Sequence, residues 1–200
     1  MNDQYYTASP ASASRPVETN FAFRGRELRF TTDAGVFSKG DLDQGTRILL
    51  DALPDLGGAG TLLDLGCGWG AIGVSLASAY AGLQVTMADV NRRAVGLAGA
   101  NAAANGVADR CRAVESDGFA ALRGERFDAV VTNPPIRAGK ATIYQMFADA
   151  KDHLNPGGSL YLVIRKQQGA ESCIKYLNTL FAQVEKLDRS AGFWVIGAKD

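Results

Sequence analysis

The stretch Asn133-Pro134-Pro135-Ile136 combines groups that could bind a planar amine. The Asn133 side chain offers an oxygen acceptor, and the Pro134 carbonyl offers a second one. Proline rings fix φ at about −65°, so both acceptors would be held on a rigid turn. Such a pair could accept both N–H bonds of an amide-like or aryl amine and aim the nitrogen lone pair at an electrophile. Asn and Pro are also common in ordinary turns that end a strand, so other positions must decide.

A glycine-rich segment between Asp64 and Gly73 is expected to bind a nucleotide cofactor. It ends an apolar strand and opens a helix, where glycines let the backbone turn tightly and approach a ligand. The spacing Gly68-x-Gly70-x-x-Gly73 matches the dinucleotide fingerprint, with Asp89 about twenty residues later, where a ribose-binding acid belongs. The same segment reads Asp64-x-Gly66-x-Gly68-x-Gly70, which resembles motif one of class I methyltransferases. The glycines alone leave a nicotinamide dinucleotide and S-adenosylmethionine both open.

Acidic residues after three successive predicted strands favour the methyl donor. Asp64 lies at the end of the first strand, where the family that it resembles has an acid near the methionine part of the cofactor. Asp89 follows the second strand, and its two oxygens could accept from both ribose hydroxyls. Asp117 follows the third and could accept from the adenine amino group. A dehydrogenase would account for Asp89 but for neither Asp117 nor the tetrapeptide, although each acid alone could be a simple cap or turn residue.

Strands and helices alternate from Thr61 onward, which predicts an α/β fold with a mostly parallel sheet covered on both faces. The expected strands are 61–65, 84–89, 111–115, 127–132 and 159–164, and the expected helices are 70–81, 92–105, 141–154 and 170–181. Two final strands, 183–188 and 193–198, should form an antiparallel hairpin, which makes seven strands in all. Ahead of this unit we expect a flexible tail over 1–18, a strand pair within 20–32 and a helix over 41–53, so the domain spans 19–200.

Caps and turns refine these expectations. Asp41 is the expected N-cap of the helix over 41–53, and His153 the expected C-cap of the helix over 141–154. The run Asn155-Pro156-Gly157-Gly158 is expected to stop that helix before the next strand. Since ligands of such sheets bind beyond the carboxyl ends of the strands, four segments should converge there: Gly66 to Gly70, Asp89, Ser116-Asp117 and Asn133 to Ile136.

Three segments resemble the "methyltransferase small" family, which includes bacterial ribosomal RNA small-subunit guanine-amino methyltransferases. They are Gly35 to Thr46, Leu63 to Gly73 and Asn133 to Lys140, and the resemblance runs from about Asn20 to the C-terminus. It implies a Rossmann-like class I methyltransferase fold and methyl transfer from S-adenosylmethionine to an exocyclic amino nitrogen, with a guanine of ribosomal RNA as the first expectation. The implied catalytic residues are Asn133, Pro134, Pro135 and Ile136. The implied cofactor-binding residues are Phe37, Ser38, Asp64, Gly66, Cys67, Gly68, Gly70, Asp89, Val90, Asp117, Gly118 and Asn133.

Two departures from the family bear on the substrate. Ile136 stands where many relatives have an aromatic residue that stacks on the target base, and Phe37 could supply the missing ring. We expect no duplicated N-terminal domain of the kind that ribosomal enzymes with this catalytic half can carry, so that either this one domain recognises the RNA or the target is something smaller. Candidate RNA contacts near the cofactor edge are Arg24, Arg26, Arg29, Arg137, Lys140, Arg165 and Lys166. Methylation of adenine or of a protein glutamine, a nicotinamide-dependent oxidoreductase and a non-catalytic RNA-binding module remain alternatives.

The composition of the chain restricts which classes of function remain open. Lys and Arg balance Asp and Glu, 21 against 21, so any nucleic-acid binding must come from a local patch. Cys67, Cys111 and Cys173 lie far apart and in no metal-ligand spacing, so we expect reduced thiols and no metal. No stretch approaches the roughly 18 apolar residues of a membrane span. We therefore expect a cytoplasmic protein, either a monomer or a homodimer.

Overall fold

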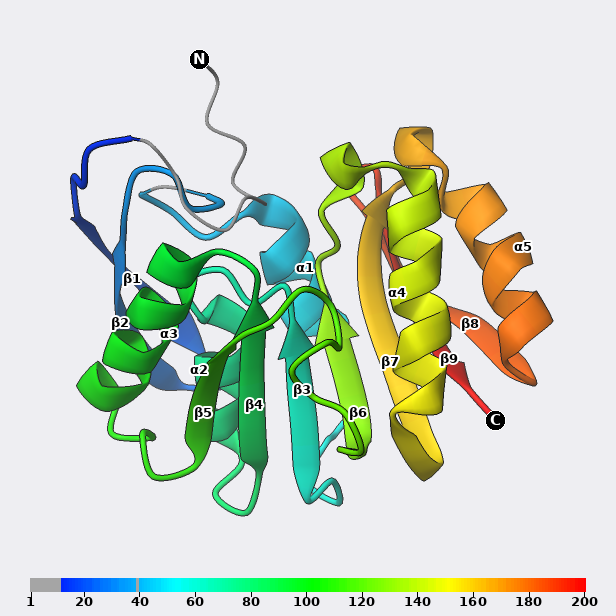
Figure 1. The fold of residues 1–200 in the computed structure, drawn as a ribbon, viewed down its shortest axis with the longest axis horizontal. Helices are drawn as coiled ribbons and strands as arrows, with labels where there is room; N and C mark the ends of the chain where they lie inside the picture. The colour runs from blue at the N-terminus through cyan, green and yellow to red at the C-terminus, as the bar shows by residue number, and fades with distance from the viewer. Residues whose placement is uncertain (1–11, 39) are drawn as a thin grey trace.

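A seven-stranded mixed sheet forms the centre of the molecule in the computed structural model, which describes residues 12–38 and 40–200 (Figure 1). The strand order is β5-β4-β3-β6-β7-β9-β8. β5, β4, β3, β6 and β7 run parallel, and β9 is antiparallel to both β7 and β8. The bounds are β3 Thr61–Leu65, β4 Gln84–Asp89, β5 Cys111–Glu115, β6 Phe127–Thr132, β7 Leu154–Arg165, β8 Gln183–Ser190 and β9 Phe193–Lys199. The expected fold class, including the closing hairpin, is confirmed.

Helices cover both faces of this sheet and enclose two apolar cores. The first core joins the sheet to α1 (Gln44–Ala52), α2 (Ala71–Ala79), α3 (Arg92–Ala104) and a separate hairpin of β1 (Val17–Phe23) and β2 (Arg26–Thr32). The second joins the opposite face to α4 (Lys140–Asp152) and α5 (Ala170–Leu180). Short 3-10 turns η1 (Ile136–Ala138) and η2 (Lys166–Gln168) follow β6 and β7. Burial on both sides explains why β3 and β6 are mostly apolar, with Asp64 and Asp128 as interruptions.

Three differences from the sequence-based expectation concern the cap of α1, the start of β7 and the start of β1. Helix α1 begins after Asp43, whose carboxylate accepts from the Thr46 N–H at 3.0 Å, so Asp43 and not Asp41 is the N-cap. Helix α4 ends at Asp152, before Asn155 as expected, but β7 begins at Leu154 and includes Asn155 to Gly158, where its register with β6 shifts in a bulge. β1 begins at Val17, within the segment predicted to be a tail, and residues 1–11 lie outside the described part of the chain.

The hairpin β1–β2 is attached to helix α3 by two asparagine side chains. Asn101 accepts from the Thr31 N–H at 2.8 Å and donates to the Thr31 carbonyl at 2.9 Å. Asn105, one helical turn later, makes the same pair of hydrogen bonds with Arg29 at 3.0 and 2.7 Å. Residues at i and i+4 share one helix face, so the two amides follow the edge of β2 as a neighbouring strand would.

The topology also determines where a ligand can bind. β4 lies on one side of β3 and β6 on the other, so the chain reverses its direction across the sheet at β3. Beyond the carboxyl ends of strands at such a switch point, the connections leave a crevice. None of the helices in the described residues is long and apolar enough to cross a membrane.

Candidate active site

A cavity opens at the carboxyl ends of β3, β4, β5 and β6. The four segments expected to converge all contribute to it, namely the glycine turn after β3, Asp89, Ser116-Asp117 and the tetrapeptide after β6. The lining residues are Val36, Phe37, Leu65, Gly66, Gly68, Ala88, Asp89, Val90, Ala94, Ser116, Asp117, Gly118, Asn133, Pro134, Pro135, Ala138, Thr142 and Met146. The mixture of apolar walls with a few polar groups is typical of a small-molecule site.

The glycine turn after β3 is shaped by its neighbour β4. Gly66 and Gly68 have φ of +72° and +55°, values that L side chains rarely adopt. The N–H groups of Gly66 and Cys67 both donate to the Ala88 carbonyl, at 2.8 and 3.0 Å. The Gly68 N–H donates to Oδ2 of Asp89 at 2.8 Å. The turn is therefore a rigid wall of the cavity, with exposed backbone where a ligand can approach closely.

Asp89 is held at the cavity wall by backbone donors. Its Oδ2 accepts from Gly68, and its Oδ1 accepts from the Asn91 N–H at 2.8 Å. Burial raises the pKa of this carboxyl, and the hydrogen bonds from Asn91 and Gly68 oppose that rise. Each carboxylate oxygen has a second lone pair, so both oxygens can still accept from ligand hydroxyls.

Asp64 lies beneath the glycine turn, fully buried, and is not among the residues that line the cavity. Its Oδ2 accepts from the Gly73 N–H of α2 at 2.8 Å, whereas Oδ1 has no hydrogen-bond partner. Burial raises the pKa of this carboxyl to about 7, with a further contribution from the charge of Asp89. In this structure the residue joins β3 to α2 and supports the turn from below.

Asn133 stands at the end of β6 and is bound by the start of α1. Its Nδ2 donates to Oδ2 of Asp43 at 3.0 Å and to Oγ1 of Thr46 at 2.9 Å. The preceding residue, Thr132, donates through Oγ1 to the Leu65 carbonyl at 2.7 Å and so ties the end of β6 to the end of β3. The position of Asn133 is thus fixed from both sides.

A second, smaller hollow adjoins the main cavity and shares Phe37, Gly66, Gly68 and Asn133 with it. Its own lining residues are Ser38, Leu42, Asp43, Thr46, Cys67, Trp69, Ala71 and Ile72. Asn133 therefore lies where the two spaces meet. The thiol of Cys67 is buried here, and burial raises its pKa well above the usual value, which disfavours a reactive thiolate.

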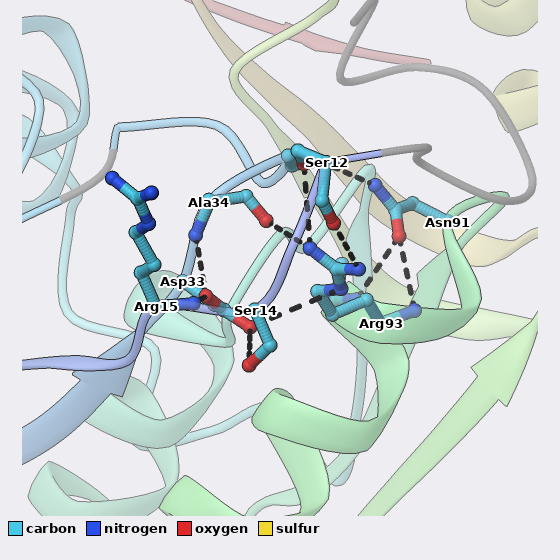
Figure 2. Close-up of polar contacts among 9 residues, drawn as sticks. Ser12, Ser14, Arg15, Asp33, Ala34, Asn91 and Arg93 are labelled. Carbon is cyan, nitrogen blue, oxygen red and sulfur yellow. Dashed lines mark hydrogen bonds and ion pairs between the residues drawn. The ribbon is translucent and has the colours of Figure 1, made fainter.

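The loop that carries Val36 and Phe37 is held over the cavity by a polar network (Figure 2). Asp33 accepts from the Ser14 hydroxyl and from the Arg15 and Ala34 N–H groups. Arg93, at the start of α3, donates to the carbonyls of Ala34 and Ser12. The Asn91 side chain donates to the Gly35 carbonyl at 2.8 Å, and the Asn91 N–H also donates to Asp89. Asn91 thus connects the loop that carries Val36 and Phe37 to Asp89.

The other predicted site residues occupy different places. Val90, Asp117 and Gly118 line the main cavity, and Ser38 and Cys67 line the smaller one. Gly70 lines neither and is the N-cap of α2. Ile136 packs against the second apolar core and is not a lining residue.

Sequence reasoning missed the contacts that Asp43 and Thr46 make with Asn133, and it missed Thr142 and Met146 in the cavity wall. Asp43 and Thr46 had one signal in the sequence, because they lie in the segment that resembles the family's cofactor-flanking region. Thr142 and Met146 had none.

Basic residues divide between the two ends of the molecule. Arg137 and Lys140 follow Asn133 directly, and Arg165 and Lys166 end the neighbouring parallel strand β7, so all four exposed side chains belong to the cavity edge. Arg24, in contrast, donates to the carbonyl of Leu53 and lies over the Tyr80 ring, at the C-terminal ends of α1 and α2. The expectation that Arg24, Arg26 and Arg29 lie near the cofactor edge is therefore wrong, because the hairpin turn points to the opposite edge of the sheet.

The chain is similar to a known protein family and to several known proteins. The family model described as "Methyltransferase small domain" matches residues 27–197. The uncharacterized protein YbxB of Bacillus subtilis is 40% identical over 200 residues, which cover 100% of this chain and 99% of that protein. The ribosomal RNA small subunit methyltransferase C of Hahella chejuensis is 37% identical over 175 residues, which cover 82% of this chain and 50% of that one.

A solved structure shares the whole architecture. The T. thermophilus 16S rRNA N2 G1207 methyltransferase (RsmC), in complex with AdoMet and guanosine, has a TM-score of 0.81 and 28% identity. The match covers 96% of this chain and 52% of that one, so the chain spans about half the length of the ribosomal RNA methyltransferases that it matches. These findings confirm the methyltransferase class expected from the sequence and its methyl donor, S-adenosylmethionine. The chain belongs to the methyltransferase small domain family.

Proposed function

We propose that the chain transfers the methyl group of S-adenosylmethionine to the exocyclic amino nitrogen of a guanine in ribosomal RNA. The observation that carries the proposal is that Asn133, Pro134 and Pro135 line the same cavity as the glycine turn and Asp89. A methyl donor held by that turn would lie beside the two oxygen acceptors of the tetrapeptide. The relatives that act on ribosomal RNA, one of them solved with guanosine, supply the substrate class.

The residues of the cavity fit this cofactor. Asp89 presents carboxylate oxygens for the ribose hydroxyls, and the exposed Asp117 lies further along the wall for the adenine amino group. Pro135, Ala138 and Met146 give an apolar wall against which a purine ring can pack. Bound in this cavity, the cofactor would supply an electrophilic methyl group on a sulfonium.

The chemistry asked of the protein is alignment and acceptance of two hydrogen bonds. The amino nitrogen of guanine is a poor nucleophile because its lone pair is delocalised into the ring. Oδ1 of Asn133 and the Pro134 carbonyl would accept its two N–H bonds, concentrate charge on the nitrogen and aim the lone pair at the methyl carbon. Alignment of this kind can contribute up to about 7–11 kcal/mol. As the nitrogen–methyl bond forms and the sulfur–methyl bond breaks, positive charge would move from sulfur to nitrogen. The methylated nitrogen would then lose a proton to water, so no strong base is needed beside the amine.

The sole histidine of the chain supports a mechanism without a general base in the site. His153 caps α4, and its carbonyl accepts from the Phe127 N–H at the amino end of β6. Asn133 follows the carboxyl end of the same strand, so the imidazole lies at the opposite edge of the sheet.

The basic side chains at the cavity edge supply contacts for RNA phosphates. Arg137, Lys140, Arg165 and Lys166 are all exposed there. A guanine in a helix would have to leave its stack to reach Asn133, and phosphate contacts along the edge formed by the ends of β6 and β7 would hold the strand while it does so.

The experiment is methyl transfer with radiolabelled cofactor to both ribosomal subunits, naked ribosomal RNA, DNA and total protein from cells that lack this chain. We expect label in RNA, and mass spectrometry of the digested nucleosides should identify N2-methylguanosine. Label in adenosine or in protein glutamine would replace the guanine assignment. A thermal shift with NADH but none with S-adenosylhomocysteine would overturn the methyltransferase proposal, since a ligand at 100 times its Kd adds about 2.7 kcal/mol of stability.

A further inference from the structure

We propose that Asp43 and Thr46 are positioning residues that fix the Asn133 amide with its oxygen, and not its nitrogen, available to the amine. The inference rests on the catalytic role proposed above for Asn133. The amide nitrogen lies 3.0 Å from Oδ2 of Asp43 and 2.9 Å from Oγ1 of Thr46. Both partners belong to the start of α1, and Asp43 precedes Asn133 by 90 positions.

The two orientations of an asparagine amide have opposite consequences for this reaction. With oxygen toward the amine, the side chain accepts an N–H bond. With nitrogen toward the amine, N–H groups would face N–H groups and the target would be repelled. A carboxylate only accepts hydrogen bonds, so Asp43 can face only the Nδ2 atom of Asn133. The reversed amide would set two oxygen acceptors about 3 Å apart with no hydrogen between them, an arrangement that burial makes costly.

Thr46 completes the restraint. An amide nitrogen carries two hydrogens, and α1 provides one acceptor for each of them. One acceptor would fix the direction in which the nitrogen points, and the second also fixes the amide plane. Because one of these bonds is charge-assisted, it also polarises the amide and makes Oδ1 a stronger acceptor.

The acceptors themselves are held in place. Oδ2 of Asp43 accepts from the Thr46 N–H at 3.0 Å as the cap of α1. Between them, Gly45 leaves no room for a side chain, since an added Cβ would lie 2.8 Å from Cε1 of Phe193 and 3.0 Å from the Asp43 carboxylate. Thr46 is only 6% exposed. The start of α1 is therefore a rigid support for the amide.

The competing role for these residues is direct contact with the cofactor, because Asp43 and Thr46 also line the smaller hollow. The two roles differ in what they change. A positioning residue affects kcat and leaves cofactor binding alone, whereas a cofactor ligand changes the Kd for S-adenosylhomocysteine.

The test compares loss and rescue variants at each position. Asp43→Ser keeps a good helix cap but removes the carboxylate, and Asp43→Asn restores a side-chain oxygen of the same reach. Thr46→Val removes the acceptor at nearly constant shape, and Thr46→Ser restores it. Asp51→Asn, on the exposed side of α1, is the matched control. For each protein, kcat and KM are measured with ribosomal RNA as substrate. The Kd of S-adenosylhomocysteine is measured by titration, and the Tm by thermal unfolding.

We expect Asp43→Ser and Thr46→Val each to lower kcat by about ten- to a hundred-fold, the range that misplacement of a reacting group produces. Thr46→Ser should recover most of its loss. Asp43→Asn should recover only part, because its oxygen can still accept from Nδ2 but its amide can also donate and carries no charge. The Kd should stay within about two-fold in all variants. In an Asn133→Ala background, Asp43→Ser should lower the residual rate no further.

Unchanged kcat in both loss variants would overturn the inference, and so would a loss that follows only the Kd or the Tm. If Asn133→Ala itself is fully active, the proposed function fails first. An inactive Asn133→Ala together with fully active loss variants would reject only the role of Asp43 and Thr46.

Discussion

The Asp64 carboxyl group accepts a hydrogen bond from the Gly73 N–H at 2.8 Å in a place that water does not reach, since Asp64 is 0% exposed. One oxygen is satisfied there, and the other has no partner. A protonated carboxyl suits this environment better than a carboxylate, which agrees with the pKa raised to about 7. The contact that supports the glycine turn is therefore sensitive to pH.

Asp64→Asn should remove a pH dependence of stability. Between about pH 4 and pH 7 the unfolded chain has lost the Asp64 proton while the folded chain retains it, so the free energy of unfolding falls as pH rises. The slope from this group is at most about 1.4 kcal/mol per pH unit, and it flattens above the folded pKa. Urea unfolding without cofactor at pH 5 and pH 8 should show the variant gaining stability relative to the parent as pH rises. A constant difference would show that Asp64 is ionised in the folded protein.

Asn133→Ala should abolish methyl transfer while the Kd for S-adenosylhomocysteine changes little. The substitution removes the proposed acceptor of the amine but none of the groups around Asp89. We expect kcat to fall by at least about a hundred-fold, the typical cost of a lost electrostatic contact in an active site. Asn178→Ala, an exposed asparagine of α5 whose side chain donates to the Ile174 carbonyl, is the control. Equal loss of binding and turnover would place Asn133 in the cofactor site instead.

Gly73→Ala and Gly96→Ala should have opposite effects on stability, although both glycines are helical. A Cβ at Gly73 would lie 2.7 Å from Cγ of Met87, so α2 would be pushed off β4 at a cost of about 1–3 kcal/mol. A Cβ at Gly96 meets nothing within 4 Å, and alanine there should add about 0.5–1 kcal/mol through helix propensity. Chemical denaturation of the two variants provides the measurement, and a stable Gly73→Ala protein would contradict the close packing.

Replacement of Arg137, Lys140, Arg165 and Lys166 by glutamine should weaken RNA binding whatever the sequence of the RNA. The binding constant K falls as salt rises, and each lost phosphate contact should make the slope of log K against log salt less negative by about 0.7–0.9. Arg26→Gln, at the start of β2 beside the hairpin turn, should leave both affinity and slope unchanged. Filter binding over a range of salt concentrations gives both quantities. An effect of Arg26→Gln as large as that of one cavity-edge variant would show that RNA reaches the opposite end of the molecule.

The sequence predicted the sheet, the cavity edge and the segments that converge there from local patterns, and the family resemblance added lining residues such as Phe37, Val90 and Gly118. Buried strands read as apolar runs, and polar residues that follow them must meet at one edge. Contacts between distant segments had no such signal. Asp43 reaches Asn133 only because α1 packs on the same face as the glycine turn, and Arg24 points away only because the hairpin attaches to α3 in one direction. Asn155 to Gly158 formed a typical turn sequence, and pairing with β6 placed it within a strand.

The asparagine pair on α3 has a consequence for how the molecule behaves at high concentration. A strand with an unpaired edge is a template on which another chain can add, and β2 pairs with a strand on one side only. Asn101 and Asn105 bond to the free N–H and C=O groups of Thr31 and Arg29 on the other side. Two side chains thereby occupy the backbone groups of the β2 edge that a strand from another molecule would need, and they do so without a third strand.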